Sequence, residues 1–443
     1  MAELFEELPG SGGETRARAS GSAGRARLRS PVRDEVTLQV CDLDALVGED
    51  HPVRIIWAYA SRVDFSAFEA NVKSREGEPG MPRTSPRLLL ALWLYATTRG
   101  VGSARELARS CESDAAFRWL RGGVSVNHRL LSEFRVAQGE RIGALLAEHV
   151  ASLSVAGVID LDEIAQDGVR VRASAGAASF RRRKTLESEL EKAKALVEGL
   201  GKDEDEDPGA SGKRAKAAKE RAAKEREARV SAALDALGEA EKLREKRLKT
   251  NKAQAEKQKE PRASATDADA RAMKMADGGF RPAYNVQFAS SPENGIVVAV
   301  SCETVGSDRG LAEPMAAAIE ETYGQRPKIH LVDGGYNSAD DIEAAAKAGT
   351  TMYCPPVKSK SGKDPHAPRE GDSPALAAWR ARMASEEGKA RYKRRSRCEL
   401  PHARFRNLGL DHVLLRGKQK VLSWMRWFAL ASNLLTEVRL RAA

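Results

Sequence analysis

Three carboxylates in this 443-residue sequence have the residue type and placement for a metal-dependent reaction: Asp167, Asp333 and Glu399. Asp167 falls in the middle of a predicted strand over residues 163–173, where apolar and polar residues alternate. Aspartate is depleted in strands, so a carboxylate in that position is explained more easily by function than by local propensity.

Asp333 stands at the end of a second predicted strand, since residues 329–332 form an apolar run of the length of a buried strand. Gly334 and Gly335 follow, and we expect this pair to adopt positive φ and to let another group approach closely. Ser338 then predicts the N-cap of a helix. Open α/β sheets place their chemistry at such strand ends, although Asp333 could also simply begin a turn.

Glu399 belongs to a third pattern, at the end of a helix predicted over residues 377–395 and beyond. Tyr392, Arg395 and Glu399 are spaced i, i+3 and i+7, which predicts one shared helical face. Arg406 lies seven residues further on and continues that face if Pro401 does not divert the chain. The ordinary explanation of a glutamate among arginines is a surface ion pair.

Two strand aspartates and a helix glutamate, without histidine or cysteine, are ligands that suit Mg²⁺ or Mn²⁺ rather than zinc. Two such ions can activate a water or a 3′-hydroxyl and stabilise the leaving oxygen of an in-line phosphoryl displacement. Tyr392, Arg395 and Arg406 would then hold phosphates of the substrate through charge-assisted hydrogen bonds. The sequence therefore predicts a phosphoryl-transfer site at the edge of an α/β sheet.

The N-terminal third has a different pattern. Residues 1–34 are rich in Gly, Ser, Arg and Ala, which predicts a disordered tail, and residues 35–150 read as a helical domain. A well-bounded helix is predicted over 85–100, and another over 103–120 that is broken near Ser113. A short helix over 126–135 follows a Gly-Gly turn and carries four residues that could contact DNA: Asn127, His128, Arg129 and Arg135. The pattern fits a helix-turn-helix DNA reader and an ordinary helical bundle equally well.

Residues 181–262 interrupt the sheet pattern with a charged segment. It has no aromatic residue, so it cannot build a core of its own. Leu186, Leu190, Ala193, Val197 and Leu200 follow the 4-3 spacing of a coiled-coil seam, and a second apolar seam returns after residue 212. The pattern predicts an inserted helical hairpin, and a charged, solvated helix pair explains it better than DNA contact does.

After residue 262 the strand pattern returns, with strands at 283–289 and 295–303, a helix over 311–323 and a strand at 350–356. The net charge of +10 suggests a polyanionic partner, but only weakly. Five scattered cysteines without a CxxC pair argue against a zinc site or disulfides and fit a reducing compartment. The longest apolar run, residues 88–96, is too short to span a membrane, and we expect a cytoplasmic protein without an export signal, associated with the nucleoid when bound to DNA.

Over about residues 36–440 the chain resembles bacterial insertion-sequence transposases of the DDE type, in the group with a Tyr-Arg-Glu-Lys signature. The resemblance rests on several motifs in the right order: SPRLLLALWLYATTRG, NHRLLSEFR, QDGVRVRASAG, TDADARAMKMADGGFRPAYNVQFA, LVDGGYNS and the C-terminal CELPHARFRNLGLDHVLLRG. The signature falls on Tyr392, Arg395 and Glu399, but its last position is Arg406 instead of lysine. Arginine keeps the charge and adds a bidentate fork.

The resemblance implies an α/β fold: an RNase H-like catalytic domain over residues 151–443, interrupted by the hairpin and preceded by a helical DNA-binding domain. It implies that Asp167, Asp333 and Glu399 bind two Mg²⁺ or Mn²⁺ ions. It also implies recognition of double-stranded terminal inverted repeats, cleavage of donor DNA, joining of the 3′-OH ends to target DNA, and a homodimer on paired ends. Two alternatives remain open: an inactive, DNA-binding descendant, and a metal-dependent nuclease without strand transfer.

Overall fold

The computed structural model describes residues 41–70, 82–202, 210–250, 260–357, 364–410 and 412–442. The tail predicted over residues 1–34 lies outside this part of the chain. No described helix is long and apolar enough to cross a membrane. The N-terminal helices are α1 (Pro52–Arg62), α2 (Ser66–Ala70), α3 (Pro86–Thr98), α4 (Ala104–Ser113), α5 (Ala115–Arg121), α6 (His128–Ala137) and α7 (Arg141–Val155).

Local signals set the ends of these helices. Helix α3 begins with Pro86 in its first turn and is buried almost all round, as its uninterrupted apolar sequence predicts. The predicted break near Ser113 is confirmed, because Asp114 ends α4 and its carboxylate accepts the N–H groups of Ala116 and Phe117 to begin α5. Gly122 ends α5 with φ of +54°, a left-handed conformation that favours glycine.

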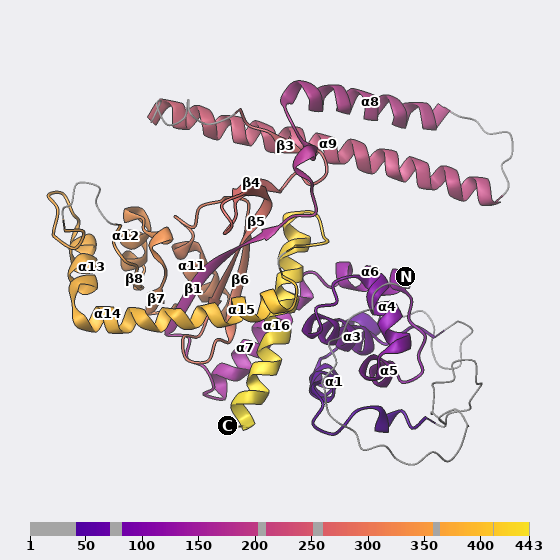
Figure 1. Ribbon diagram of the computed structural model, residues 1–443, viewed down its shortest axis with the longest axis horizontal. Coiled ribbons are helices and arrows are strands. Elements are labelled where there is room, and N and C mark those ends of the chain that lie inside the picture. The colour runs from indigo at the N-terminus through magenta and orange to yellow at the C-terminus, as the bar shows by residue number, and fades with distance from the viewer. Residues whose placement is uncertain are drawn as a thin grey trace, which may run out of the picture. The chain divides into compact units, whose positions relative to one another are not determined.

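The C-terminal part is built on a six-stranded mixed sheet (Figure 1). The central strand β1 (Glu163–Arg172) pairs antiparallel with β5 (Phe280–Ser290), and β5 pairs antiparallel with β6 (Val297–Glu303) and with β4 (Arg271–Lys274). On its other side β1 pairs parallel with β7 (Ile329–Leu331), which pairs parallel with β8 (Thr351–Tyr353). The four antiparallel strands β4, β6, β5 and β1 are thus continued by the two parallel strands β7 and β8; the order is β4-β5-β1-β7-β8, with β6 also paired to β5.

The last helix, α16 (Lys418–Ala442), joins the helical part to the sheet. It packs against α3, α7 and β6. Trp424 meets Trp93 of α3 edge-on, and the Asn433 amide exchanges two hydrogen bonds of 2.7 and 2.8 Å with the backbone of Val297 in β6. One continuous apolar core runs from α1 through α16 to the sheet. The boundary expected near residue 150 therefore does not separate two cores.

A second, smaller core covers the parallel end of the sheet. It is formed by β7 and β8 with α12 (Ala339–Lys347), α13 (Pro374–Ala384) and α14 (Glu386–Lys393). The helix expected over 377–395 is in fact two helices, since Ser385 ends α13 in extended conformation and caps α14 with its hydroxyl. Helix α11 (Ala312–Tyr323) matches the helix expected over 311–323, and its Tyr323 hydroxyl donates to the Val298 carbonyl.

The charged segment forms two helices, α8 (Arg183–Lys202) and α9 (Ala210–Thr250), which pack on each other. Their contact is made by a small apolar cluster of Leu186 from α8 and Val230, Ala233 and Leu237 from α9. Two short strands, β2 (Phe180–Arg181) and β3 (Ala263–Ser264), pair antiparallel at the base of the helices. The chain thus leaves for α8 and returns from α9 at neighbouring points.

The remaining short elements are the 3-10 helices η1 (Asp44–Leu46), η2 (Ala177–Ser179), η3 (Gly334–Tyr336) and η4 (Arg394–Cys398), and helix α15 (Glu399–Asn407). Of these, η3, η4 and α15 carry or adjoin the candidate site residues.

His330 makes the fold sensitive to acid. It lies in β7 between Ile164 and Met352, and burial lowers the pKa of His330 to about 3. Between the ordinary histidine pKa and that value the unfolded chain binds a proton that the folded chain does not, so stability falls as the pH falls. We expect the free energy of unfolding to drop about 1 kcal/mol more between about pH 6 and pH 5 in the native chain than in His330→Leu. Denaturant melts at both pH values measure this, and equal losses would contradict it.

Candidate active site

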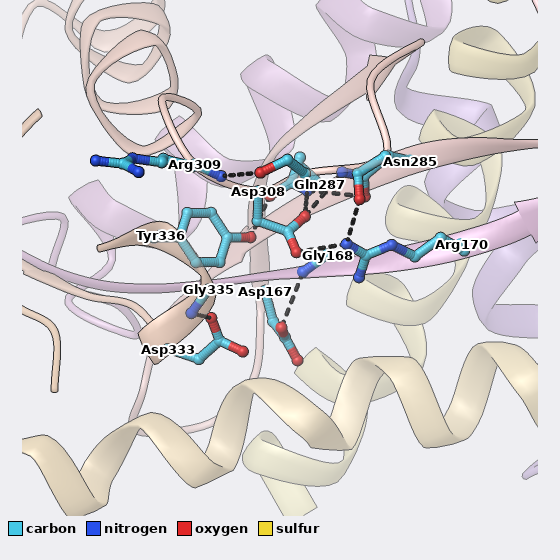
Figure 2. A network of polar contacts seen from close by, with 12 residues as sticks. Asp167, Gly168, Arg170, Asn285, Gln287, Asp308, Arg309, Asp333, Gly335 and Tyr336 are labelled. Carbon is cyan, nitrogen blue, oxygen red and sulfur yellow. Dashed lines mark hydrogen bonds and ion pairs between the residues drawn. The ribbon is translucent and has the colours of Figure 1, made fainter. Parts of the chain in front are cut away.

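The two strand aspartates lie side by side because of the parallel register of β1 and β7. The last pair of that ladder is Ala165 with Leu331, and each aspartate is two residues further along the chain, Asp167 still within β1 and Asp333 just after β7. Side chains two residues apart point to the same face of a sheet. Figure 2 shows the Asp167 and Asp333 carboxylates projecting to the same side. The structure therefore brings together the two acids that the sequence singled out.

The two carboxyl groups differ in their electrostatics. Burial raises the pKa of Asp333, and the charges of Asp167 and Asp308 raise it further, against the opposing effects of the Gly335 N–H and Arg395. Burial acts in the same direction on Asp167, but His402, Arg395 and the Gly168 N–H outweigh it, so the pKa of Asp167 is below its usual value. Neighbouring cations and an N–H group thus stabilise the ionised form of Asp167, whereas burial and the repulsion from other carboxylates destabilise the ionised form of Asp333. Such perturbed carboxyl groups are typical of functional sites.

The turn after Asp333 differs from the expected one. Gly334 and Gly335 do not adopt positive φ; together with Tyr336 they form the 3-10 turn η3. The Gly335 N–H donates to Asp333 Oδ1 at 2.7 Å, and a Cβ on Gly335 would lie 2.9 Å from that oxygen. Glycine is therefore required here by close approach and not by a left-handed backbone. Ser338 does precede α12, but its side chain makes no capping hydrogen bond, which corrects that expectation.

Glu399 reaches the pair only through Arg395. Tyr392, Arg395 and Glu399 do not lie on one continuous α-helix, because α14 ends at Lys393 and η4 separates it from α15. Pro401 lies in the first turn of α15. Because proline has no N–H, it cannot donate the α-helical hydrogen bond to the carbonyl four residues before it. Arg395 lies between Asp167 and Glu399. Its Nη1 is 3.9 Å from Asp167 Oδ2, and its Nη2 is 3.4 Å from Glu399 Oε1.

Tyr392 lies on the other side of Arg395, with its ring centroid 6.0 Å from the guanidinium carbon. Tyr392 and Glu399 both lie beside Arg395, as their spacing predicted, and Arg395 also approaches Asp167. The side chain of Glu399 remains 64% exposed. Within the described residues, no three His, Cys, Asp or Glu side chains are arranged as a metal-binding group. Asp167 and Asp333 supply hard oxygen donors of the kind that Mg²⁺ and Mn²⁺ take, but the three-carboxylate set expected with Glu399 is not assembled.

His402 belongs to the site and was not identified from the sequence. It is buried, its Nδ1 lies 3.5 Å from Asp167 Oδ2, and its ring packs 5.5 Å from that of Phe288. His402 follows Arg395 by seven residues and Glu399 by three. Residues three and seven positions apart lie on one side of a helix, so this spacing could have placed His402 beside Arg395 and Glu399 from the sequence.

A buried polar network supports the acid pair from the opposite face of the sheet (Figure 2). Asp308 accepts from Asn285 Nδ2 at 2.8 Å and from Gln287 Nε2 at 2.9 Å, and its other oxygen pairs with Arg170 at 2.7 Å. The Tyr336 hydroxyl, in the turn after Asp333, donates to Gln287 Oε1. The network therefore ties the turn that carries Asp333 to strand β5.

These network residues were also missed by the sequence reasoning. Asn285 and Gln287 are fully buried polar residues two positions apart in β5, so they share a face. Their polar character inside an otherwise apolar strand was the available signal, because buried amides need hydrogen-bond partners. Asp308 gave no such signal, since its position in a polar loop looks ordinary.

Arg406 lies apart from the other signature residues. It is exposed near the end of α15 and lines a pocket with Gly168, Arg172 and Arg281, beyond the acid pair along β1. Tyr392 and Arg395 do not line this pocket, and the 3-10 segment η4 between α14 and α15 changes the helical period that would have placed Arg406 on their face.

The four candidate residues of α6 separate into two groups. Asn127 caps the helix by accepting the Leu130 N–H, and His128 and Arg129 are exposed beside it. Arg135 is instead 7% exposed and lies between the rings of Trp93 and Trp424, 4.2 and 4.9 Å from their centroids. Burial lowers the pKa of Arg135 to about 10, and its Nη1 donates to the Gly102 carbonyl. It is a core residue, which corrects the prediction that it contacts DNA.

Comparison with known families bears on both halves of the chain. Residues 245–434 match the family model described as "Transposase DDE domain", and residues 41–137 match the one described as "Transposase domain (DUF772)". Both regions are thus similar to transposase domains, and the C-terminal one to the DDE type. Neither the curated proteins nor the solved structures gave a match. The DDE match includes Asp333 and Glu399 but begins after Asp167, whose place rests on the β1–β7 register.

The sheet order and the DDE domain together fit an RNase H-like catalytic domain. The acid pair lies just beyond the last residues of the parallel β1–β7 ladder, on the side where open α/β sheets hold ligands: Asp333 follows the end of β7, and Asp167 lies in the middle of the longer β1. The mixed α/β class expected from the sequence is therefore confirmed at this level.

Gly168 is required by the network behind the acid pair. A Cβ there would lie 2.7 Å from Asp308 Oδ1 and 3.0 Å from Asn285 Oδ1, and closer still to Gln287 Nε2. We expect Gly168→Ala to lower the free energy of unfolding by about 1–3 kcal/mol, the usual effect of overpacking. Gly176→Ala is the matched control, since nothing lies within 4 Å of a Cβ there. Denaturant melts that show equal stability for both variants would contradict the requirement.

Proposed function

We propose that the protein is a transposase of the group with the Tyr-Arg-Glu-Lys signature. It binds the terminal inverted repeats of its insertion sequence, cleaves donor DNA and joins the 3′-OH ends to target DNA, acting in the cytoplasm on nucleoid DNA. The observation that carries the proposal is the Asp167–Asp333 pair just beyond the parallel β1–β7 ladder, beside Arg395, in a chain with two transposase matches.

Asp167 and Asp333 are the residues that would hold two Mg²⁺ or Mn²⁺ ions, with Glu399 as the third ligand. Such ions activate the attacking hydroxyl and stabilise the leaving oxygen of the phosphodiester. Binding of a cation would relieve the repulsion that raises the pKa of Asp333. His402 and the Gly168 N–H keep Asp167 ionised and fixed in orientation.

Arg395 has a second role in this proposal. In the absence of DNA its guanidinium occupies the space between Asp167 and Glu399. A phosphate of the substrate is a better partner for a guanidinium than two long contacts to carboxylates, because it accepts a bidentate pair of hydrogen bonds. If the Arg395 guanidinium binds a phosphate of the DNA instead, Glu399 becomes available to the metal. Tyr392 would then donate a hydrogen bond to the same DNA strand.

The helical part would recognise the terminal repeats. His128 and Arg129 are exposed at the start of α6, where the helix dipole also favours an anion, and the side-chain amide N–H of Asn127 remains free to donate. A short helix after a Gly-Gly turn is the arrangement of many DNA readers.

One observation favours an inactive, DNA-binding descendant as the second candidate. Glu399 is exposed and held by Arg395, and no three metal-binding side chains converge within the described residues. A metal-dependent nuclease would use the same residues as the transposase, so only its products distinguish it.

Catalysis and recognition should separate by mutation. On a labelled DNA carrying the terminal repeats with Mg²⁺, we expect Asp333→Asn to abolish cleavage without loss of binding, because it removes a metal ligand. Arg129→Ala should weaken binding, because it removes an exposed phosphate contact. Asp340→Asn is the matched control, an exposed aspartate in the first turn of α12.

Each outcome of this assay has a meaning. Binding without cleavage by the native chain would favour the inactive descendant. Cleavage without joined products would favour the nuclease. Cleavage by Asp333→Asn would refute the assignment of this carboxylate.

We further propose that two chains act together on two paired DNA ends, as the family resemblance implies. We expect light scattering of the native chain with two repeat-bearing DNA ends to give the mass of a dimer on both ends. A monomer on paired ends would refute this.

A further inference from the structure

Two adjoining pockets form a basic groove on the catalytic sheet. They share Arg172 and Arg281 in their walls. Six cationic side chains line the groove against one acid, Asp277: Arg170, Arg172, Lys274, Arg281, Arg406 and Arg416. An excess of one charge in a concave surface focuses the electrostatic field and attracts a polyanion.

Half of these cations are already engaged. Arg170 pairs with Asp308 and Arg281 with Asp277, each at 2.7 Å, and Arg416 Nε donates to a backbone carbonyl. The other three, Arg172, Lys274 and Arg406, are exposed and have no hydrogen-bond or ion-pair partner among the described side chains. Their charge is therefore free to neutralise an anionic ligand.

The groove begins beside the active site. Gly168 and Val169 line one end of it, and they directly follow Asp167 in β1. Its other end is the hairpin of β4 and β5, which turns at residues 275–279. Arg172 and Asp167 point to opposite faces of β1, and the pairing of β1 with β7 ends at Ala165. A chain of phosphates that passes the acid pair would therefore cross the edge of β1 beyond Ala165 to reach Arg172, Arg406 and the hairpin.

Phe280 stands at this far end. It is 70% exposed and is the one aromatic residue among the large apolar side chains exposed in the described part of the protein. It lines the groove next to Arg281, and its strand partner is Lys274. An exposed aromatic ring among cations is the combination with which proteins hold single-stranded nucleic acids, the cations on phosphates and the ring against a base.

We propose that this groove binds a single-stranded segment of the DNA next to the bond being cut, with Phe280 stacked on an unpaired base. The proposal rests on the function proposed above and adds where the DNA strand lies and that it is unpaired there. A base within a duplex offers its face only to its neighbours, so a stacking ring requires a strand that has left the helix. The binding is independent of sequence, because phosphates and base faces are common to all nucleotides.

The test measures binding of the full-length chain, by fluorescence anisotropy at several salt concentrations, to a single-stranded oligonucleotide and to a blunt duplex of the same sequence. We expect Phe280→Ala to weaken binding of the single strand at least about fivefold. Binding of the duplex should not change, and Phe280→Tyr should bind as the native chain does. Arg172→Ala and Lys274→Ala should each lower the slope of log affinity against log salt by roughly 0.7 for the single strand.

Lys347→Ala is the matched control, because it removes an exposed lysine of α12 outside the groove. All changed side chains are exposed, and thermal melts verify that each variant is folded. The inference is overturned if Phe280→Ala binds the single strand like the native chain, if it weakens the duplex equally, or if the salt slopes are those of Lys347→Ala. If the inference is overturned in one of these ways but the native chain still cuts repeat-bearing DNA, the proposed function remains supported. Groove variants that lose single-strand binding in a chain that cuts no DNA would refute the proposed function alone.

Discussion

Two carboxylates held side by side repel each other, and the catalytic half of this protein is arranged to hold such a pair. The parallel ladder of β1 and β7 fixes Asp167 and Asp333 on one face of the sheet. The repulsion appears in the raised pKa of Asp333, while His402, Arg395 and a backbone N–H stabilise Asp167. A cation bound between the two carboxylates would relieve this repulsion, which is the role of the metal ions in the function that we propose.

The opposite face of β1 explains why the pair keeps its geometry. Amides are costly to bury unless they are fully hydrogen-bonded, and Asn285 and Gln287 are bonded to each other and to Asp308. Through Gln287 the same network holds Tyr336, and with it the turn of Asp333. A network with so many satisfied partners has few alternative arrangements, so it limits how far the acid pair can separate.

The helical part and the sheet are linked more closely than their separate patterns suggest. Helix α16 contributes to both, and Arg135, from the predicted DNA-reading helix, is held between Trp93 of α3 and Trp424 of α16. Burying a guanidinium this deeply is favourable only with aromatic faces and a carbonyl to replace its water. Helix α6 is thus packed against the same core that supports β6. If α6 binds DNA, this packing would fix the position of that DNA relative to the sheet.

The sequence by itself determined the features that depend on near neighbours. Alternation located β1 with Asp167, a short apolar run located β7 before Asp333, and local signals located the start of α3 at Pro86 and the break near Ser113. The tertiary structure alone decided which residues meet across long separations. It gave the parallel register of β1 with β7, the burial of Arg135, the contact of His402 with Asp167, and the position of Arg406 in the basic groove. The reason is physical: caps and alternation are set by residues a few positions apart, whereas burial and register depend on packing between segments that the sequence does not order in space.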